Sequence, residues 1–180
     1  MWLALIKQYW NVTLFREEPG NTPYSTLLLV IIGSAFFALI VMQWMMSDIT
    51  HQLPFGSALL IAGTLAFSYA LYTWILLSLF KLKTRFVQTL TCLFAGHTAV
   101  HLVAFPLLLI MPLLLDVKSV GVVGSLVGMV YLVLTLMLAI WQFVVSTYVY
   151  KYALGAPYFS GVLAGFGLLA FNILTISLWR

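Results

Sequence analysis

Two histidines four residues apart, His97 and His101, are the side chains of this sequence best placed to do chemistry. They lie within a long apolar stretch, and a spacing of four puts both rings on one face of a helix, one turn apart. Two imidazoles so placed could bind a metal ion or ligate haem iron. Because an ionisable residue inside a membrane segment is a functional hypothesis by default, this pair is the candidate cofactor-binding site.

Three roles for the pair stay open. In the one we favour, both rings are neutral and hydrogen-bonded to backbone or to Ser and Thr of a neighbouring helix. In the second they meet a cofactor or polar group of a partner protein, and in the third they hold a metal ion. A catalytic metal site usually has three protein ligands, and the remaining candidates, Asp48, His51 and Asp116, fall in loops. We therefore expect no metal and no cofactor of the protein's own.

The other reactive side chains form no recognisable catalytic group. A single cysteine, Cys92, rules out an intramolecular disulfide and a thiolate metal cluster built by this chain alone. No carboxylate pair lies inside the apolar stretches, and no catalytic triad or phosphate-binding glycine loop is evident. Several small polar residues are expected to hydrogen-bond between helices instead: Ser68, Thr73, Gln142, Ser146, Thr147 and Asn172. We therefore predict that the protein is not an enzyme.

The composition indicates that the helices holding these residues lie in a bilayer. Of 180 residues, 64% are hydrophobic and 7% are charged, against about 45–50% apolar and about 25% charged in soluble domains. So few charges cannot cover a water-facing surface, whereas lipid accepts apolar side chains. The net charge of +4 comes without a dense basic patch, so nucleic acid is not an expected partner.

Five apolar stretches each supply the roughly 20 residues that a crossing of about 30 Å needs. They predict an all-α, polytopic membrane protein with one transmembrane domain over residues 25–180 and spans at about 25–46, 57–80, 87–115, 122–150 and 158–179. The third stretch contains Pro106 and Pro112, so a kink is expected, and a re-entrant break is the alternative.

The first 24 residues are too short to span. Within Trp2–Phe15, Lys7, Gln8 and Asn11 fall on one side of a helix and Trp, Tyr and Leu cover most of the rest. This pattern predicts a short amphipathic helix in the membrane interface, followed by a polar turn at 16–24. A cleaved signal peptide is not expected, because Lys7 follows the apolar start and no small-residue cleavage site follows.

Loop charges predict the orientation. The N-terminal segment and the loops after the second and fourth spans hold six Lys and Arg, and the opposite side holds two, Lys118 and Arg180. By the positive-inside rule the N-terminus is cytoplasmic and the C-terminus is external.

Two glycine pairs predict close helix contacts. Gly124 and Gly128 open the fourth span, and Gly161 and Gly165 open the fifth. A spacing of four puts both glycines of a pair on one face, where another backbone can approach closely. We expect these four residues to form interfaces, with at least one pair facing another copy or a partner subunit.

Three segments together resemble bacterial members of the YIP (Ypt/Rab-interacting protein) superfamily. They are Thr22-Pro-Tyr-Ser25 before the first span, Arg85–Thr91 running on to Phe105-Pro106-Leu107, and Trp141 through Lys151–Leu154 with Pro157. The resemblance implies five spans, a cytoplasmic N-terminus, a periplasmic C-terminus in the bacterial inner membrane, and no known catalytic residues. The histidine pair is not part of that family's pattern.

The sequence thus favours a non-catalytic membrane protein that works by contact with other membrane proteins, its own copies or lipids, as an accessory or assembly subunit or an organiser. The rival is a small transporter or lipid-handling channel, which normally shows charged cavity residues or repeated broken helices. A metal- or haem-associated subunit using His97 and His101 is the second alternative.

Overall fold

In a computed structural model the described residues, 2–47, 54–116 and 121–179, form a bundle of helices with no strand. The side chains of residues 111–116 and 121–124 are not described. The short N-terminal helix is α1 (Trp2–Thr13), and two single 3-10 turns are η1 (Pro19–Asn21) and η2 (Lys83–Arg85). The long helices are α2 (Thr26–Ser47), α3 (Phe55–Leu79), α4 (Phe86–Asp116), α5 (Gly121–Leu154) and α6 (Tyr158–Ser177).

Five of these helices are long and apolar enough to cross a membrane, which confirms the predicted all-α, five-span architecture. Their bounds lie within a few residues of the expected spans. The re-entrant break considered for the third span is wrong, because α4 runs as one helix through Pro106 and Pro112. Each proline removes one intrahelical hydrogen bond, but the helix continues on both sides.

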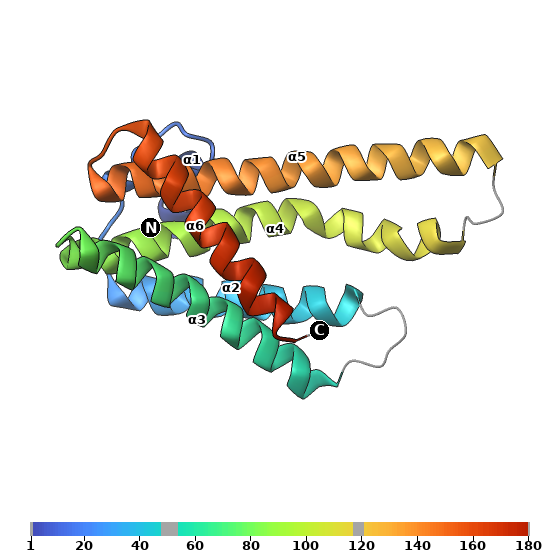
Figure 1. The fold of residues 1–180 in the computed structure, drawn as a ribbon, viewed down its shortest axis with the longest axis horizontal. Helices are drawn as coiled ribbons and strands as arrows, with labels where there is room; N and C mark the ends of the chain where they lie inside the picture. Colours follow the sequence, from blue (N-terminus) through green and yellow to red (C-terminus); the bar gives the residue numbers. More distant parts are fainter. Residues whose placement is uncertain (1, 48–53, 117–120, 180) are drawn as a thin grey trace.

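The helices pack as neighbours across the sequence, not only in chain order. α4 packs against α2 and α5, and α6 packs against α5 and α3. Figure 1 shows α4 and α5 side by side along the long axis, reaching well beyond the ends of α2, α3 and α6. We call residues 125–140 of α5 and 102–110 of α4 the arm.

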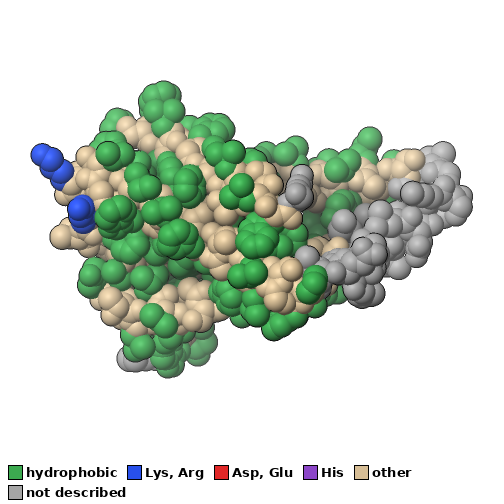
Figure 2. All heavy atoms as spheres, turned by 60° about the horizontal axis from the view of Figure 1, so that its bottom comes forward, with side chains coloured by type: hydrophobic (Ala, Val, Ile, Leu, Met, Phe, Trp, Pro, Cys, Tyr) green, Lys and Arg blue, Asp and Glu red, His purple; other side chains and the backbone are tan. Residues whose placement is uncertain are grey.

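The connections at one end of the bundle are polar and tightly bonded. The Arg85 guanidinium donates to the carbonyls of Tyr152 and Ala153, at 3.2 and 2.9 Å, and so satisfies the last turn of α5. Gln88 Nε2 donates to the Gly20 and Thr22 carbonyls. Helix α5 ends at Gly155, whose φ of +59° is a conformation that glycine adopts without strain. On the face in Figure 2, Lys and Arg side chains appear at one end only, beside a surface of hydrophobic side chains.

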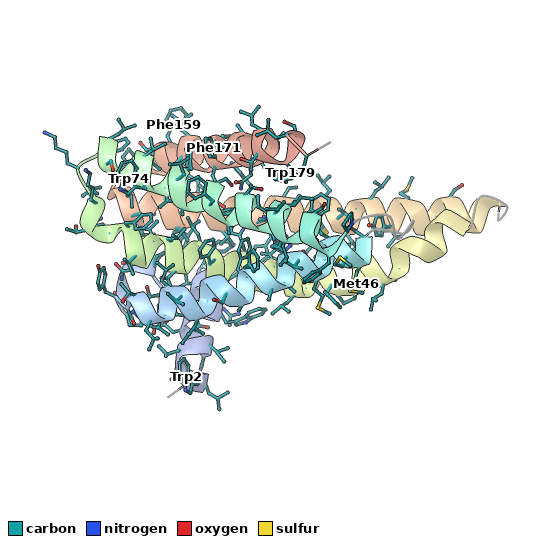
Figure 3. All side chains as sticks on the ribbon, turned by 90° about the horizontal axis from the view of Figure 1, so that it is seen from below. Trp2, Met46, Trp74, Phe159, Phe171 and Trp179 are labelled. Carbon is teal, nitrogen blue, oxygen red and sulfur yellow. The ribbon has the colours of Figure 1, made fainter. Side chains whose placement is uncertain are left out.

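Helix α1 lies across the long axis of the bundle, with Trp2 at its outer end (Figures 1 and 3). Its inner side is buried through Tyr9, Val12 and Thr13, and the Trp141 indole donates to the Thr13 carbonyl at 3.2 Å. Its outer side exposes Trp2, Leu3 and Ile6. This transverse, two-sided helix has the form of one that lies in the membrane interface.

Candidate functional site

His97 is the centre of a buried hydrogen-bond network between three helices. It is 2% exposed, and three polar side-chain atoms lie close enough to its ring to bond. Nδ1 lies 2.8 Å from both the Tyr69 hydroxyl on α3 and Nε2 of Gln142 on α5, and Nε2 lies 2.9 Å from Ser146 Oγ, also on α5. The network therefore joins α3, α4 and α5 at the centre of the bundle.

The bonding pattern determines which nitrogen of His97 carries the proton. Ser146 Oγ donates to the Gln142 carbonyl at 3.1 Å, so it accepts from His97 Nε2–H. Nδ1 is then the acceptor, and the Tyr69 hydroxyl and the Gln142 amide share its single lone pair. Both ring nitrogens are in use, so metal binding would require breaking a buried hydrogen bond.

His101 differs from His97, although the two share one face of α4. None of the described residues hydrogen-bonds its ring, which packs edge-on to Phe36 with centroids 6.1 Å apart. Its backbone carbonyl accepts from Gln43 Nε2 at 3.0 Å, which ties α4 to α2 at this level. The imidazole of His101 is thus held in place while its donor and acceptor stay available.

Two adjoining cavities meet at His101. The larger, of about 370 Å³, is lined by residues of all five spanning helices, and the smaller, of about 220 Å³, extends toward His97. Both are lined by His101 and Gln142. The larger has the apolar wall of Ile40, Leu65 and Val100, with polar groups on Gln43, Tyr131 and Thr135, and none of its described lining residues is charged.

The other polar residues expected to bond within the membrane mostly do so. Ser68 Oγ donates to Asn172 Oδ1 at 2.7 Å, linking α3 to α6, and Thr73 pairs with the Tyr150 hydroxyl at 2.8 Å, linking α3 to α5. Thr147 Oγ1 is an exception, because it is buried without a partner among the described residues.

The four glycines predicted to form interfaces lie in different surroundings. A Cβ on Gly161 would stand 2.7 Å from the Thr147 carbonyl oxygen, and one on Gly165 2.7 Å from Thr147 Oγ1, so this pair lies where α6 crosses α5. A Cβ on Gly128 would meet nothing within 4 Å in the described part of the chain. Gly124 lies in α5, but its surroundings are outside the description. Contact of either pair with another chain stays a prediction.

Sequence reasoning missed several partners of the site. Tyr69, on another helix, was not singled out, nor were Gln43 or Tyr150. Gly96 was also missed, although a Cβ there would lie 2.6 Å from Val145 on α5. A tyrosine or a lone glycine in an apolar span carries no pattern that reveals its neighbour, so no sequence signal was available for them.

The remaining ligand candidates give no further site. Among the described residues, no group of three His, Cys, Asp or Glu could hold a metal ion. Asp48, His51, Lys118 and Arg180 lie outside the described residues, as does the side chain of Asp116. Cys92 is buried in the core, 3.3 Å from Thr22 Oγ1. Comparison of the chain with known protein families, with characterised proteins and with solved structures finds no match.

Proposed function

We propose that this multi-pass membrane protein acts without catalysis, by contact with another membrane protein or a second copy, as an accessory or assembly subunit or an organiser. The observation that carries the proposal is the state of α5. None of the residues in its most apolar stretch is buried, whereas 28% to 33% are buried in the corresponding stretches of the other four spanning helices.

The arm explains this difference. Helix α5 begins beyond the ends of α2, α3 and α6 (Figure 1), and from Tyr131 on it also borders the cavity that residues of those helices line. Its exposed apolar side chains point in many directions around the helix: Leu126, Val127, Met129, Val130, Leu132, Val133, Leu134, Leu136, Met137 and Ile140. Lipid can cover such a surface, and so can a helix of another protein.

The Gly128 surface favours a protein helix as the cover. In lipid there is no hydrophobic drive between helices, so association depends on small residues that let backbones approach. The Gly161 and Gly165 pair is already occupied by α5 of the same chain, whereas a Cβ on Gly128 would meet no described atom within 4 Å. Gly128 therefore provides a site on the arm where a helix of another chain can approach closely.

The rivals have weaker support. The described spans hold no charged cavity residue of the kind that marks many transport paths. A haem- or metal-associated role for the histidine pair conflicts with the hydrogen bonds at both nitrogens of His97. The proposal places the protein in a bacterial inner membrane, with the N-terminus cytoplasmic and the C-terminus periplasmic, on the basis of loop charge and the YIP resemblance.

Cross-linking in native membranes tests the contact. Gly128→Cys is introduced into a Cys92→Ala background, and Gly56→Cys, at a glycine that also faces open space, is the matched control. We expect a cross-linked product at position 128 and none at position 56. A product of twice the monomer mass identifies a second copy, and any other mass identifies a different partner by mass spectrometry.

Size on a native gel gives the second readout. A bulky Gly128→Ile should dissociate the complex and leave the fold intact, and Gly56→Ile should change neither. If Gly128→Ile migrates like the parent and position 128 gives no cross-link, the arm does not bind a protein and the proposal is wrong.

A further inference from the structure

The unpartnered ring of His101 lies where a membrane-embedded cavity meets the polar core. A cavity of about 370 Å³ falls within the roughly 300–1,000 Å³ of small-molecule sites. Its walls are mostly apolar, and they include a few polar side chains: the ring of His101, the hydroxyl of Tyr131 and the amide of Gln142. This combination, rather than the volume alone, is typical of a site for an amphipathic ligand.

Charge and hydrogen bonding restrict what the site accepts. None of the described lining residues is charged, so a phosphate, carboxylate or ammonium group would have no counter-ion among them, and its burial would be strongly unfavourable. A neutral imidazole offers one N–H donor and one acceptor nitrogen. The group that pairs with it should therefore be an uncharged carbonyl or hydroxyl.

The positioning of His101 supports a binding role. The bond from Gln43 to its backbone carbonyl and the edge contact with Phe36 fix the backbone and the ring. His97, one turn earlier on the same helix face, lines the smaller cavity and has both ring nitrogens bonded, so it offers no free donor or acceptor there. The unused donor and acceptor of His101 thus lie at a defined place in the cavity.

We propose that His101 anchors a site for an uncharged, lipid-soluble molecule that carries a carbonyl or hydroxyl group, with its apolar body against Trp44, Leu65 and Leu108. Two sources of this chemistry exist in membranes: the ring carbonyl of a quinone, and the ester carbonyl and free hydroxyl of a diacylglycerol. The hydrogen bond to His101 is the feature that both share.

Trp44 supplies a reporter, because it lines the cavity and quinones quench indole fluorescence. Purified protein is titrated with a short-chain benzoquinone, decylubiquinone. The fluorescence of Trp44 is obtained by subtracting the signal of the Trp44→Phe variant from that of the parent. We expect saturable quenching. His101→Phe should raise the dissociation constant about tenfold, as loss of a hydrogen bond predicts. Leu102→Phe, on the neighbouring exposed position of α4, should not change it.

A second variant separates loss of binding from loss of fold. Ala104 lines the cavity without touching the hydrogen-bond network, so Ala104→Phe should fill the space and abolish quenching. His101→Gln, which keeps a donor and an acceptor, should bind within about threefold of the parent. Only variants whose unfolding midpoint equals that of the parent are compared. The midpoint is measured by the reaction of Cys92 with a thiol reagent.

Competition with dioctanoylglycerol distinguishes the two sources. Displacement of the quinone shows that the site accepts a glyceride carbonyl, and quenching that persists in its presence shows preference for the quinone ring. Either result supports the site. The proposal is overturned if quenching of Trp44 is not saturable, if His101→Phe binds like the parent, or if anionic phosphatidic acid displaces the quinone better than dioctanoylglycerol does.

Discussion

Substitution of Gly161 by alanine tests the closest packing in the bundle. The added Cβ would lie 2.7 Å from the Thr147 carbonyl oxygen, 3.0 Å from Lys151 Cβ and 3.1 Å from Lys151 N. Two of these three atoms belong to the α5 backbone, which cannot rotate away as a side chain can. The α5 and α6 helices must therefore move apart to accept the methyl group.

The size of the effect follows from two opposing contributions. Overpacking of a well-packed contact costs about 1–3 kcal/mol, and replacing a helical glycine by alanine returns about 0.5–1 kcal/mol. The net loss is about 1–2 kcal/mol. For a chain of this length, 1 kcal/mol corresponds to about 2–4 °C, so the unfolding midpoint should fall by about 3–6 °C. At Gly128 a Cβ meets no described atom within 4 Å. Only the gain in helix propensity then remains, and the midpoint should rise slightly.

Cys92 provides the assay without any added cysteine. It is the single cysteine of the chain and is 1% exposed, so a thiol-reactive fluorophore in detergent solution reacts with it on unfolding. Gly161→Ala and Gly128→Ala are heated beside the parent. If Gly161→Ala unfolds at or above the parent's temperature, the close approach of α5 and α6 is wrong, whatever the result at Gly128.

Three other predictions concern the histidines and the orientation. His97→Ala should lower the unfolding midpoint more than His101→Ala, because the buried Tyr69 hydroxyl loses its bond to Nδ1 and Ser146 keeps only its bond to the Gln142 carbonyl, and an unpaired buried group costs about 1–3 kcal/mol. Equal effects in the same Cys92 assay would contradict the network. Elemental analysis and an absorbance spectrum of the purified protein should show no stoichiometric iron, copper, zinc or haem. A metal that is present in the parent and absent from the double variant His97→Ala, His101→Ala would show instead that the two histidines bind it. In a Cys92→Ala background, Lys83→Cys should react with a membrane-impermeant thiol reagent only from the cytoplasm and Arg180→Cys only from outside, and the reverse labelling would invert the topology.

The sequence alone determined the five spans, because whether a segment can cross a bilayer depends on its own length and apolarity. It likewise put His97 and His101 on one helix face, since the helical repeat is fixed. It did not decide that α4 continues through Pro106, because the proline pattern allows a kink or a break.

Only the tertiary structure separated the two histidines. Tyr69, Gln142 and Ser146 come from other helices, and their meeting at His97 depends on the rotation and depth of each helix in the bundle. The same is true of the glycines: identical spacing gives a close helix contact at Gly161 and, among the described residues, no contact at Gly128. In lipid, helix pairing depends on how well two helix surfaces fit together. The sequence of one helix describes only one of those two surfaces.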